Sequence, residues 1–197
     1  MKIQVQEKPP LNFLEREKNH YFDIFELEKM GHIPKHKYHD SLAARILLKR
    51  IALDNFGIMP ERIKFEYRFD KPFFLIGDTT YYCTISHSKH YVACGISIGK
   101  EIGIDIEDIR ERSNDVRDYI SNTKERSYFE GDQKYIATII WNIKEAVFKK
   151  DTHQIPLCHY EIVGITDGVW SVVNTTSREY FRVKNTIEND FVLSYTA

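Results

Sequence analysis

Two stretches of the chain carry apolar residues at helical spacing. The first, residues 40–53, begins at Asp40, a residue type that often caps a helix. The second, residues 133–150, has a wider apolar face that consists of Ile136, Ile139, Ile140, Ile143 and Val147, with Trp141 and Phe148 beside it. The spacing therefore predicts two long helices, and a weaker pattern predicts a shorter helix over residues 116–129.

Short segments rich in β-branched and aromatic residues follow each long helix, and turn-forming residues separate them. After the first helix they are residues 63–69, 73–76, 82–86, 91–98 and 103–106, and after the second they are residues 160–165, 169–173, 180–183 and 190–195. A helix followed by strands thus occurs twice. This order predicts an α+β protein with two similar halves that meet near residue 100.

The composition describes an ordinary globular chain of 197 residues, with 42% apolar and 29% charged residues. The net charge of −1 argues against a broad nucleic-acid-binding surface, which needs an excess of basic residues. Three cysteines are too few for a disulfide framework or a zinc site. Because no apolar run is long enough to span a membrane and residues 1–10 are polar, we expect a cytoplasmic protein that does not contact a membrane.

The segment Gly103-Ile104-Asp105-Ile106-Glu107 places two carboxylates in an expected strand. Side chains alternate along a strand, so Asp105 and Glu107 share one face. Paired carboxylates repel each other unless a cation lies between them, and oxygen ligands of this kind suit Mg²⁺. The alternative interpretation is a half-exposed strand whose acidic side chains are simply hydrated.

The second long helix carries a further carboxylate, Glu145, with Lys144 next to it and Lys149 one turn away. Glu145 and Lys149 are spaced i, i+4 and share a helix face. They could form an ordinary surface ion pair. A third carboxylate accompanied by lysines is also what a site for Mg²⁺ and pyrophosphate requires.

Histidines occur at two further places. His87, in Ser86-His87-Ser88 after a strand, could donate a hydrogen bond to phosphate, or it could be an ordinary turn residue. His32, His36 and His39 have a spacing that suggests a metal site, but Pro34 should interrupt the helix that would align them. We interpret that segment as a basic loop.

Taken in order, these segments resemble the surfactin-synthetase-activating type of 4′-phosphopantetheinyl transferase. The two signature blocks of that family resemble residues 102–107 and 141–149, and the supporting blocks resemble Lys71-Pro72, Ser86-His87-Ser88 and the helix around Arg45. Two positions depart from the family pattern. Asp70 stands where glycine usually precedes Lys-Pro, and Asn142 stands where serine is common.

The resemblance implies a fold of two α+β subdomains with pseudo-twofold symmetry, residues 1–100 and residues 101–197. Each would have a long helix packed on a small, mainly antiparallel sheet. Coenzyme A would lie in the cleft between them, and the second subdomain would carry the metal site. Since one chain supplies both walls of such a cleft, we expect a catalytically complete monomer.

Roles for individual residues also follow from the matching positions. The metal ligands for Mg²⁺ would be Asp105, Glu107 and Glu145, and the catalytic residues would be Glu145, Lys149 and His87. The residues that bind coenzyme A would be Arg45, Lys71, Pro72, Ser86, His87, Lys144, Lys149, Lys35 and Lys37. Among these, Arg45 with Lys35 and Lys37 would contact the 3′-phosphate.

The implied activity is that of a holo-[acyl-carrier-protein] synthase. It would move phosphopantetheine from coenzyme A to a serine of an apo acyl or peptidyl carrier protein and release adenosine 3′,5′-bisphosphate. Glu145 or a metal-bound water would act as the base. Two other functions stay open: a non-catalytic protein that binds coenzyme A or another nucleotide, and a Mg²⁺-dependent nucleotide hydrolase.

The segment between the two signature blocks carries several basic residues, among them Arg112 and Arg117. We expect residues 110–126 to form the surface that receives the acidic helix of the carrier protein. Because acidic residues are interleaved with the basic ones, these charges could instead merely hydrate a helix and its flanking loop.

Overall fold

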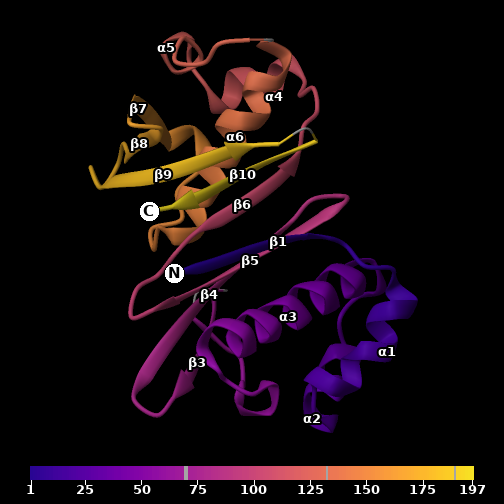
Figure 1. The fold of residues 1–197 in the computed structure, drawn as a ribbon. Helices are drawn as coiled ribbons and strands as arrows, with labels where there is room; N and C mark the ends of the chain where they lie inside the picture. The colour runs from indigo at the N-terminus through magenta and orange to yellow at the C-terminus, as the bar shows by residue number, and fades with distance from the viewer. Residues whose placement is uncertain (69–70, 132, 189) are drawn as a thin grey trace. The chain divides into compact units, whose positions relative to one another are not determined.

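The computed structural model describes residues 1–68, 71–131, 133–188 and 190–197, and it divides into two compact units (Figure 1). The first unit is Met1–Glu101 and the second is Ile102–Ala197. Within the described residues, each unit contains a five-stranded antiparallel sheet and a long helix that packs on it. The α+β class with two similar subdomains is therefore confirmed.

The first unit has its strands in the order β1-β5-β4-β3-β2, with every neighbouring pair antiparallel. Its elements are β1 (Lys2–Glu7), α1 (Leu11–Tyr21), α2 (Ile24–Gly31), α3 (Lys35–Phe56), η1 (Pro60–Arg62), β2 (Glu66–Arg68), β3 (Lys71–Ile76), β4 (Thr79–His87) and β5 (Tyr91–Ile98). The strand expected over residues 63–69 is shorter than predicted, and its last residue, Phe69, lies outside the described residues.

The helix α3 lies along one face of this sheet and packs mainly on β5 (Figure 1). Its apolar side chains, among them Leu42, Ile46 and Ile51, are buried in the core of the unit. The helix ends at Gly57, whose φ of 64° lies in the left-handed region that glycine adopts readily. The helical spacing in the sequence thus identified the face that the sheet covers.

The start of α3 differs from the prediction. The helix begins at Lys35, directly after Pro34, and not at Asp40. Proline suits the beginning of a helix because its φ is already close to the helical value and its missing N–H removes no helical hydrogen bond there. His36 and His39 therefore lie on the helix, and His39 Nε2 contacts the carbonyl oxygen of Pro9 at 2.8 Å. The basic loop predicted for this segment was wrong.

The N-terminal elements β1, α1 and α2 were not predicted. Within α1 and α2 the buried residues are Leu14 and Met30, too few to give a clear helical period. A capping box starts α2, since Asp23 accepts from the backbone of Glu26 and Glu26 accepts from the backbone of Asp23. Glu26 also pairs with the buried Lys49 of α3 at 2.8 Å, which fastens α2 to the core.

The second unit has the strand order β6-β10-β9-β8-β7, so its first strand pairs with its last. Its elements are β6 (Ile104–Asp108), α4 (Asn114–Ile120), α5 (Thr123–Arg126), α6 (Gln133–Lys150), η2 (Leu157–His159), β7 (Tyr160–Thr166), β8 (Val169–Asn174), β9 (Tyr180–Ile187) and β10 (Phe191–Thr196). The predicted bounds of α6 are confirmed. No helix in the described part of the chain is both long and apolar enough to cross a membrane.

The helix α6 packs on β6 and β10 and buries Ile136, Ile140, Ile143 and Val147. The single helix expected over residues 116–129 is instead two short helices, α4 and α5. The break has a local cause. Asn122 accepts a hydrogen bond from the backbone N–H of Glu125 and starts a new helix where the old one would have continued.

The chain enters β6 at Gly103, which lies directly against the backbone of α6. A Cβ at this position would lie 1.9 Å from the carbonyl oxygen of Ala146 and 2.9 Å from the backbone nitrogen of Lys150. Helix backbone cannot move aside as a flexible side chain would. The backbone N–H of Gly103 also donates to Thr196 Oγ1 at 3.0 Å, so β10 is fixed at the same point.

We expect Gly103→Ala to lower the free energy of unfolding by about 1–3 kcal/mol, because the added methyl group must push β6 away from α6. Urea unfolding of the full chain measures this. Gly164→Ala is the matched control in the same unit, since a Cβ there would have no heavy atom within 4 Å. Equal losses in the two variants would contradict a steric requirement at Gly103.

Candidate functional site

Two of the expected metal ligands lie on one face of β6. Asp105 and Glu107 pair with Ser194 and Val192 of β10, and strand alternation turns both carboxylates to the same side. Asp105 is buried and Glu107 is partly buried. A hydrated surface strand, the alternative open from the sequence, does not describe these carboxylates.

Asp105 is held by two side chains of α6. Lys149 Nζ donates to Asp105 Oδ1 at 2.7 Å, and the amide Nδ2 of Asn142 donates to Asp105 Oδ2 at 2.9 Å. The two donors are about two helical turns apart and bind different oxygens of one carboxylate. Lys149 therefore meets a carboxylate of the sheet in addition to sharing a helix face with Glu145.

Glu107 pairs with Arg112, whose Nη2 lies 3.0 Å from Glu107 Oε2. The side chain of Arg112 is 10% exposed, and its guanidinium lies over the ring of Trp141 with 4.4 Å to the centroid. This position corrects the expectation that Arg112 belongs to a carrier-docking surface. The positive charge of Arg112 pairs with Glu107 within the second unit.

The charge of Asp105 raises the pKa of two neighbouring carboxylates, Glu107 and Glu145. Burial raises the pKa of Glu107 and the charge of Asp105 raises it further, while Arg112 opposes both effects. Burial and the charge of Asp105 also raise the pKa of Glu145, and Lys149 opposes them. Asp105, Glu107 and Glu145 therefore lie near enough to repel one another, which a cation between them would relieve.

The donor set fits Mg²⁺, which prefers hard oxygen ligands. It offers the carboxylates of Asp105, Glu107 and Glu145 together with the amide oxygen of Asn142. Asn142 is fully buried, and its Oδ1 has no hydrogen-bond partner in the described part of the chain. In the described arrangement the ligand atoms of the three carboxylates do not all lie within 4.8 Å of one another.

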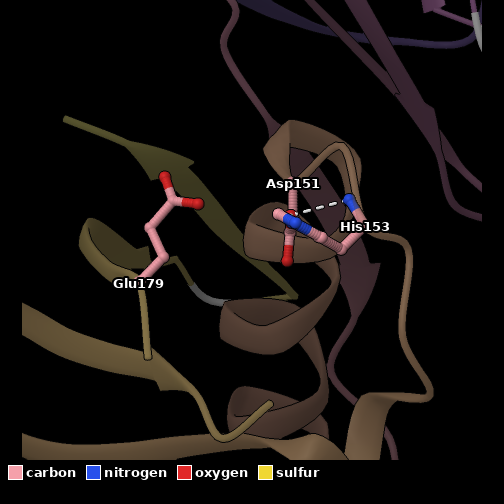
Figure 2. A group of neighbouring side chains, drawn as sticks. All are labelled: Asp151, His153 and Glu179. Carbon is pink, nitrogen blue, oxygen red and sulfur yellow. Dashed lines mark hydrogen bonds and ion pairs between the residues drawn. The ribbon is translucent and has the colours of Figure 1, made fainter. Parts of the chain in front are cut away.

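A second group of possible metal ligands does meet that distance among the described residues: Asp151, His153 and Glu179 (Figure 2). Asp151 is buried at the end of α6 and accepts hydrogen bonds from the backbone and Nδ1 of His153, from the hydroxyl of Tyr160 and from the amide of Asn174. Burial alone would raise the pKa of Asp151, but these hydrogen bonds lower it. The other two members of the group, His153 and Glu179, are exposed. Asp151 thus fixes the loop after α6, and the group is a weaker candidate for a cation.

Lys144 differs from its expected position. Its side chain is 1% exposed, and its Nζ lies 2.7 Å from Glu125 Oε1 and donates to the carbonyl oxygen of Ile120. Glu125 in turn accepts from the backbone N–H groups of Ile162 and Asn122. Burial lowers the pKa of Lys144, which the charge of Glu125 opposes. Lys144 therefore serves the core of the second unit, which corrects the expectation that it binds coenzyme A.

In the first unit, Ser86 and His87 end β4. Ser86 is buried, whereas His87 is exposed with its Nδ1 3.7 Å from Asp40 Oδ2. Asp40 also accepts from Lys8 Nζ at 2.5 Å. The exposed ring of His87 therefore lies beside a carboxylate that is itself paired with a lysine.

Arg45 lies on α3 and donates to Ser41 Oγ and, at 2.9 Å, to the hydroxyl of Tyr67. It lines a cavity of about 160 Å³ in the first unit. The other lining residues are Phe22, Glu26, Lys29, Met30, Ile33, Lys64, Phe65 and Tyr67. Aromatic side chains and three basic groups thus surround one hollow.

The remaining predicted residues of the first unit are placed as follows. Lys71 Nζ lies 3.0 Å from Glu101 Oε2, and Pro72 is buried beside it on β3. Lys35 and Lys37 are exposed in the first turn of α3. Asp70, the position that departs from the family pattern, lies outside the described residues.

Sequence reasoning missed the partners that shape these sites. Tyr67 and Lys29 line the cavity beside Arg45, but they come from β2 and α2, more than ten residues away along the chain. The helical spacing places Trp141 beside an apolar face and does not predict that its ring contacts Arg112. The available signal for this contact was an aromatic residue, Trp141, in the same segment as Glu145.

The buried pair of Lys144 and Glu125 gives a stability prediction. We expect Lys144→Met to lower the free energy of unfolding at pH 7 by about 3–5 kcal/mol, because it leaves a buried carboxylate without its cation. The variant also removes the ammonium group that donates to the carbonyl oxygen of Ile120.

Urea unfolding at pH 7 measures this effect. The double variant Lys144→Met/Glu125→Gln removes both charges and keeps an acceptor for Ile162 N–H, so it should recover most of the loss. A single variant as stable as the wild type at pH 7 would contradict the structural role of Lys144.

The comparisons with known proteins bear on the second unit. No curated protein matches the sequence. Residues 101–196 match the family model of the 4′-phosphopantetheinyl transferase superfamily. This range contains β6 and α6, and with them the carboxylate group and Lys149. Over residues 101–196 the chain is therefore similar to the 4′-phosphopantetheinyl transferase superfamily.

Proposed function

We propose that the protein transfers the 4′-phosphopantetheine group of coenzyme A to a serine of an apo acyl or peptidyl carrier protein in a Mg²⁺-dependent reaction. The single observation that supports it most is the group of Asp105, Glu107 and Glu145 beside Lys149, inside the segment that matches the model of this superfamily. Mutually repelling carboxylates are costly to keep in a fold, and a cation site gives them a function.

In the proposed reaction, the serine oxygen attacks the phosphorus that carries the pantetheine arm. The bond from that phosphorus to the bridging oxygen breaks, and adenosine 3′,5′-bisphosphate leaves. The serine proton passes to Glu145 or to water. Such a transfer depends mostly on positioning and charge neutralisation.

Mg²⁺, held by Asp105, Glu107 and Glu145, would neutralise charge on the pyrophosphate. Lys149, which donates to Asp105, is close enough to these ligands to contact the same phosphate oxygens. His87, which is exposed at the end of β4, would donate a hydrogen bond to the pyrophosphate.

The cavity beside Arg45 supports a nucleotide-binding function for the first unit. Phe65 and Tyr67 offer faces for an aromatic ring, and Arg45, Lys29 and Lys64 offer charge for a phosphate. We assign the 3′-phosphate of coenzyme A to Arg45. Lys71 and Pro72 would lie beside the nucleotide, and the exposed Lys35 and Lys37 would add positive charge.

One experiment tests the proposal against its two alternatives. The protein is mixed with coenzyme A, MgCl₂ and an apo carrier protein, and the intact mass of the carrier and the nucleotide products are measured. Transfer gives a heavier carrier and an equal amount of adenosine 3′,5′-bisphosphate. A binding protein gives neither product, and a nucleotide hydrolase gives nucleotide products with an unchanged carrier.

We expect Asp105→Ala to reduce transfer at least about 100-fold, because a bound cation contributes several kcal/mol of charge stabilisation. Excess chelator should abolish transfer by the wild type. His153→Ala is the matched control, since it removes a possible ligand from the other group and should leave transfer unchanged. The reverse pattern would move the metal to the end of α6.

Arg45 allows binding and chemistry to be separated. We expect Arg45→Ala to raise KM for coenzyme A about 10-fold or more, the scale of a lost hydrogen bond to a charged group, while kcat changes less. Dephospho-coenzyme A should be a poorer substrate for the wild type and nearly insensitive to the mutation.

Arg50→Ala is the control for this variant, because Arg50 lies on the same helix but donates to Tyr21. It should leave KM for coenzyme A unchanged. If Arg45→Ala discriminates between the two substrates as well as the wild type does, Arg45 does not contact the 3′-phosphate.

A further inference from the structure

Asn142 is one of the buried polar residues of the apolar helix α6. It is 0% exposed and lies next to Trp141, one turn before Glu145 on the same helix. Its Nδ2 donates to Asp105 Oδ2 at 2.9 Å, whereas its Oδ1 has no hydrogen-bond partner within the described residues. One half of the amide is therefore used by a carboxylate and the other half is unsatisfied.

The orientation of this amide is fixed by chemistry. An ionised carboxylate accepts hydrogen bonds and cannot donate them, so the NH₂ group must face Asp105 and the oxygen must point elsewhere. Turning the amide over would place two oxygens against each other. The unsatisfied oxygen of Asn142 is thus a consequence of its bond to Asp105.

A purely structural role explains this arrangement poorly. Buried polar groups nearly always have partners, and an apolar residue would fill the same space without leaving an acceptor unsatisfied. Asn142 adds no charge to a group that already holds Asp105 and Glu145. It can therefore orient a carboxylate without increasing the repulsion around it.

We propose that Asn142 is a positioning residue of the cation site. Its amide nitrogen fixes one oxygen of Asp105 while Lys149 fixes the other, and its amide oxygen is a neutral ligand for the cation. This inference rests on the proposed function, because it takes Asp105 as a ligand of the divalent cation. Hydrogen-bond partners of metal ligands typically change metal affinity when they are removed.

The test measures cation binding by the full-length protein without coenzyme A or carrier, with Mn²⁺ as the probe, by electron paramagnetic resonance. Asn142→Leu has a similar volume and removes both the donor and the acceptor. We expect it to weaken Mn²⁺ binding about 10- to 100-fold. In the transfer assay it should raise the Mg²⁺ concentration for half-maximal rate, and saturating Mg²⁺ should restore most of kcat.

Two further variants keep the test decisive. Asn142→Ser keeps a small hydroxyl group in place of the amide and should lose less affinity than Asn142→Leu, and it replaces that variant if Leu prevents folding. Thr138→Val is the structural control, since Thr138 is another buried polar residue of α6 but donates to the carbonyl oxygen of Arg110. It should lower stability and leave Mn²⁺ affinity within about twofold of the wild type.

The outcomes separate this inference from the proposed function. If the wild type transfers nothing, yet Asn142→Leu loses Mn²⁺ affinity and Thr138→Val does not, the positioning role stands and the proposed function fails. If the wild type is active and both Asn142 variants bind Mn²⁺ as it does, the positioning role is refuted alone. Equal losses of affinity in the Asn142 and Thr138 variants would also refute it.

Discussion

The candidate site depends on the close approach of β6 to α6 at Gly103. A residue with a side chain could occupy this position only if β6 moved away from α6, because the carbonyl oxygen of Ala146 already fills the space of its Cβ. The contact sets how far the strand lies from the helix. Asp105 follows two residues later on β6, and the distances of Asn142 and Lys149 from it depend on this contact. A glycine whose backbone N–H donates to Thr196 Oγ1 rather than to a carboxylate thus sets the spacing between the strand and the helix that carry the carboxylates.

The charged side chains on and around β6 and α6 form two separate groups, and acidic and basic residues pair within each group. Around Asp105 and Glu107, the basic partners Lys149 and Arg112 are partly accessible or held against an aromatic ring, and the pKa of Glu107 is still raised. Lys144 and Glu125, in contrast, neutralise each other inside the core and have backbone partners as well. Of these two groups, the one around Asp105 and Glu107 therefore keeps an excess of negative charge. This is the group that would bind a cation in the proposed function.

Part of this arrangement could be predicted from the sequence. Strand alternation correctly placed Asp105 and Glu107 on one face, and the helical period gave the bounds of α6. The period could not separate Lys144 from Lys149, because both stand in the same apolar helix and the difference comes from α5, which supplies Glu125 to one of them. The start of α3 was missed because a proline can begin a helix as well as end one.

The case of Asn142 shows why polar residues in apolar helices need a structure for their interpretation. In the sequence it is one departure from a family pattern, with nothing to indicate whether serine and asparagine are equivalent there. In the structure its longer side chain reaches Asp105 with the amide nitrogen, and this bond leaves the oxygen without a partner. A serine hydroxyl is shorter and can rotate to donate or accept, so it need not leave an acceptor unsatisfied. The substitution therefore exchanges an adaptable group for a rigid one beside the carboxylates that the proposed reaction requires.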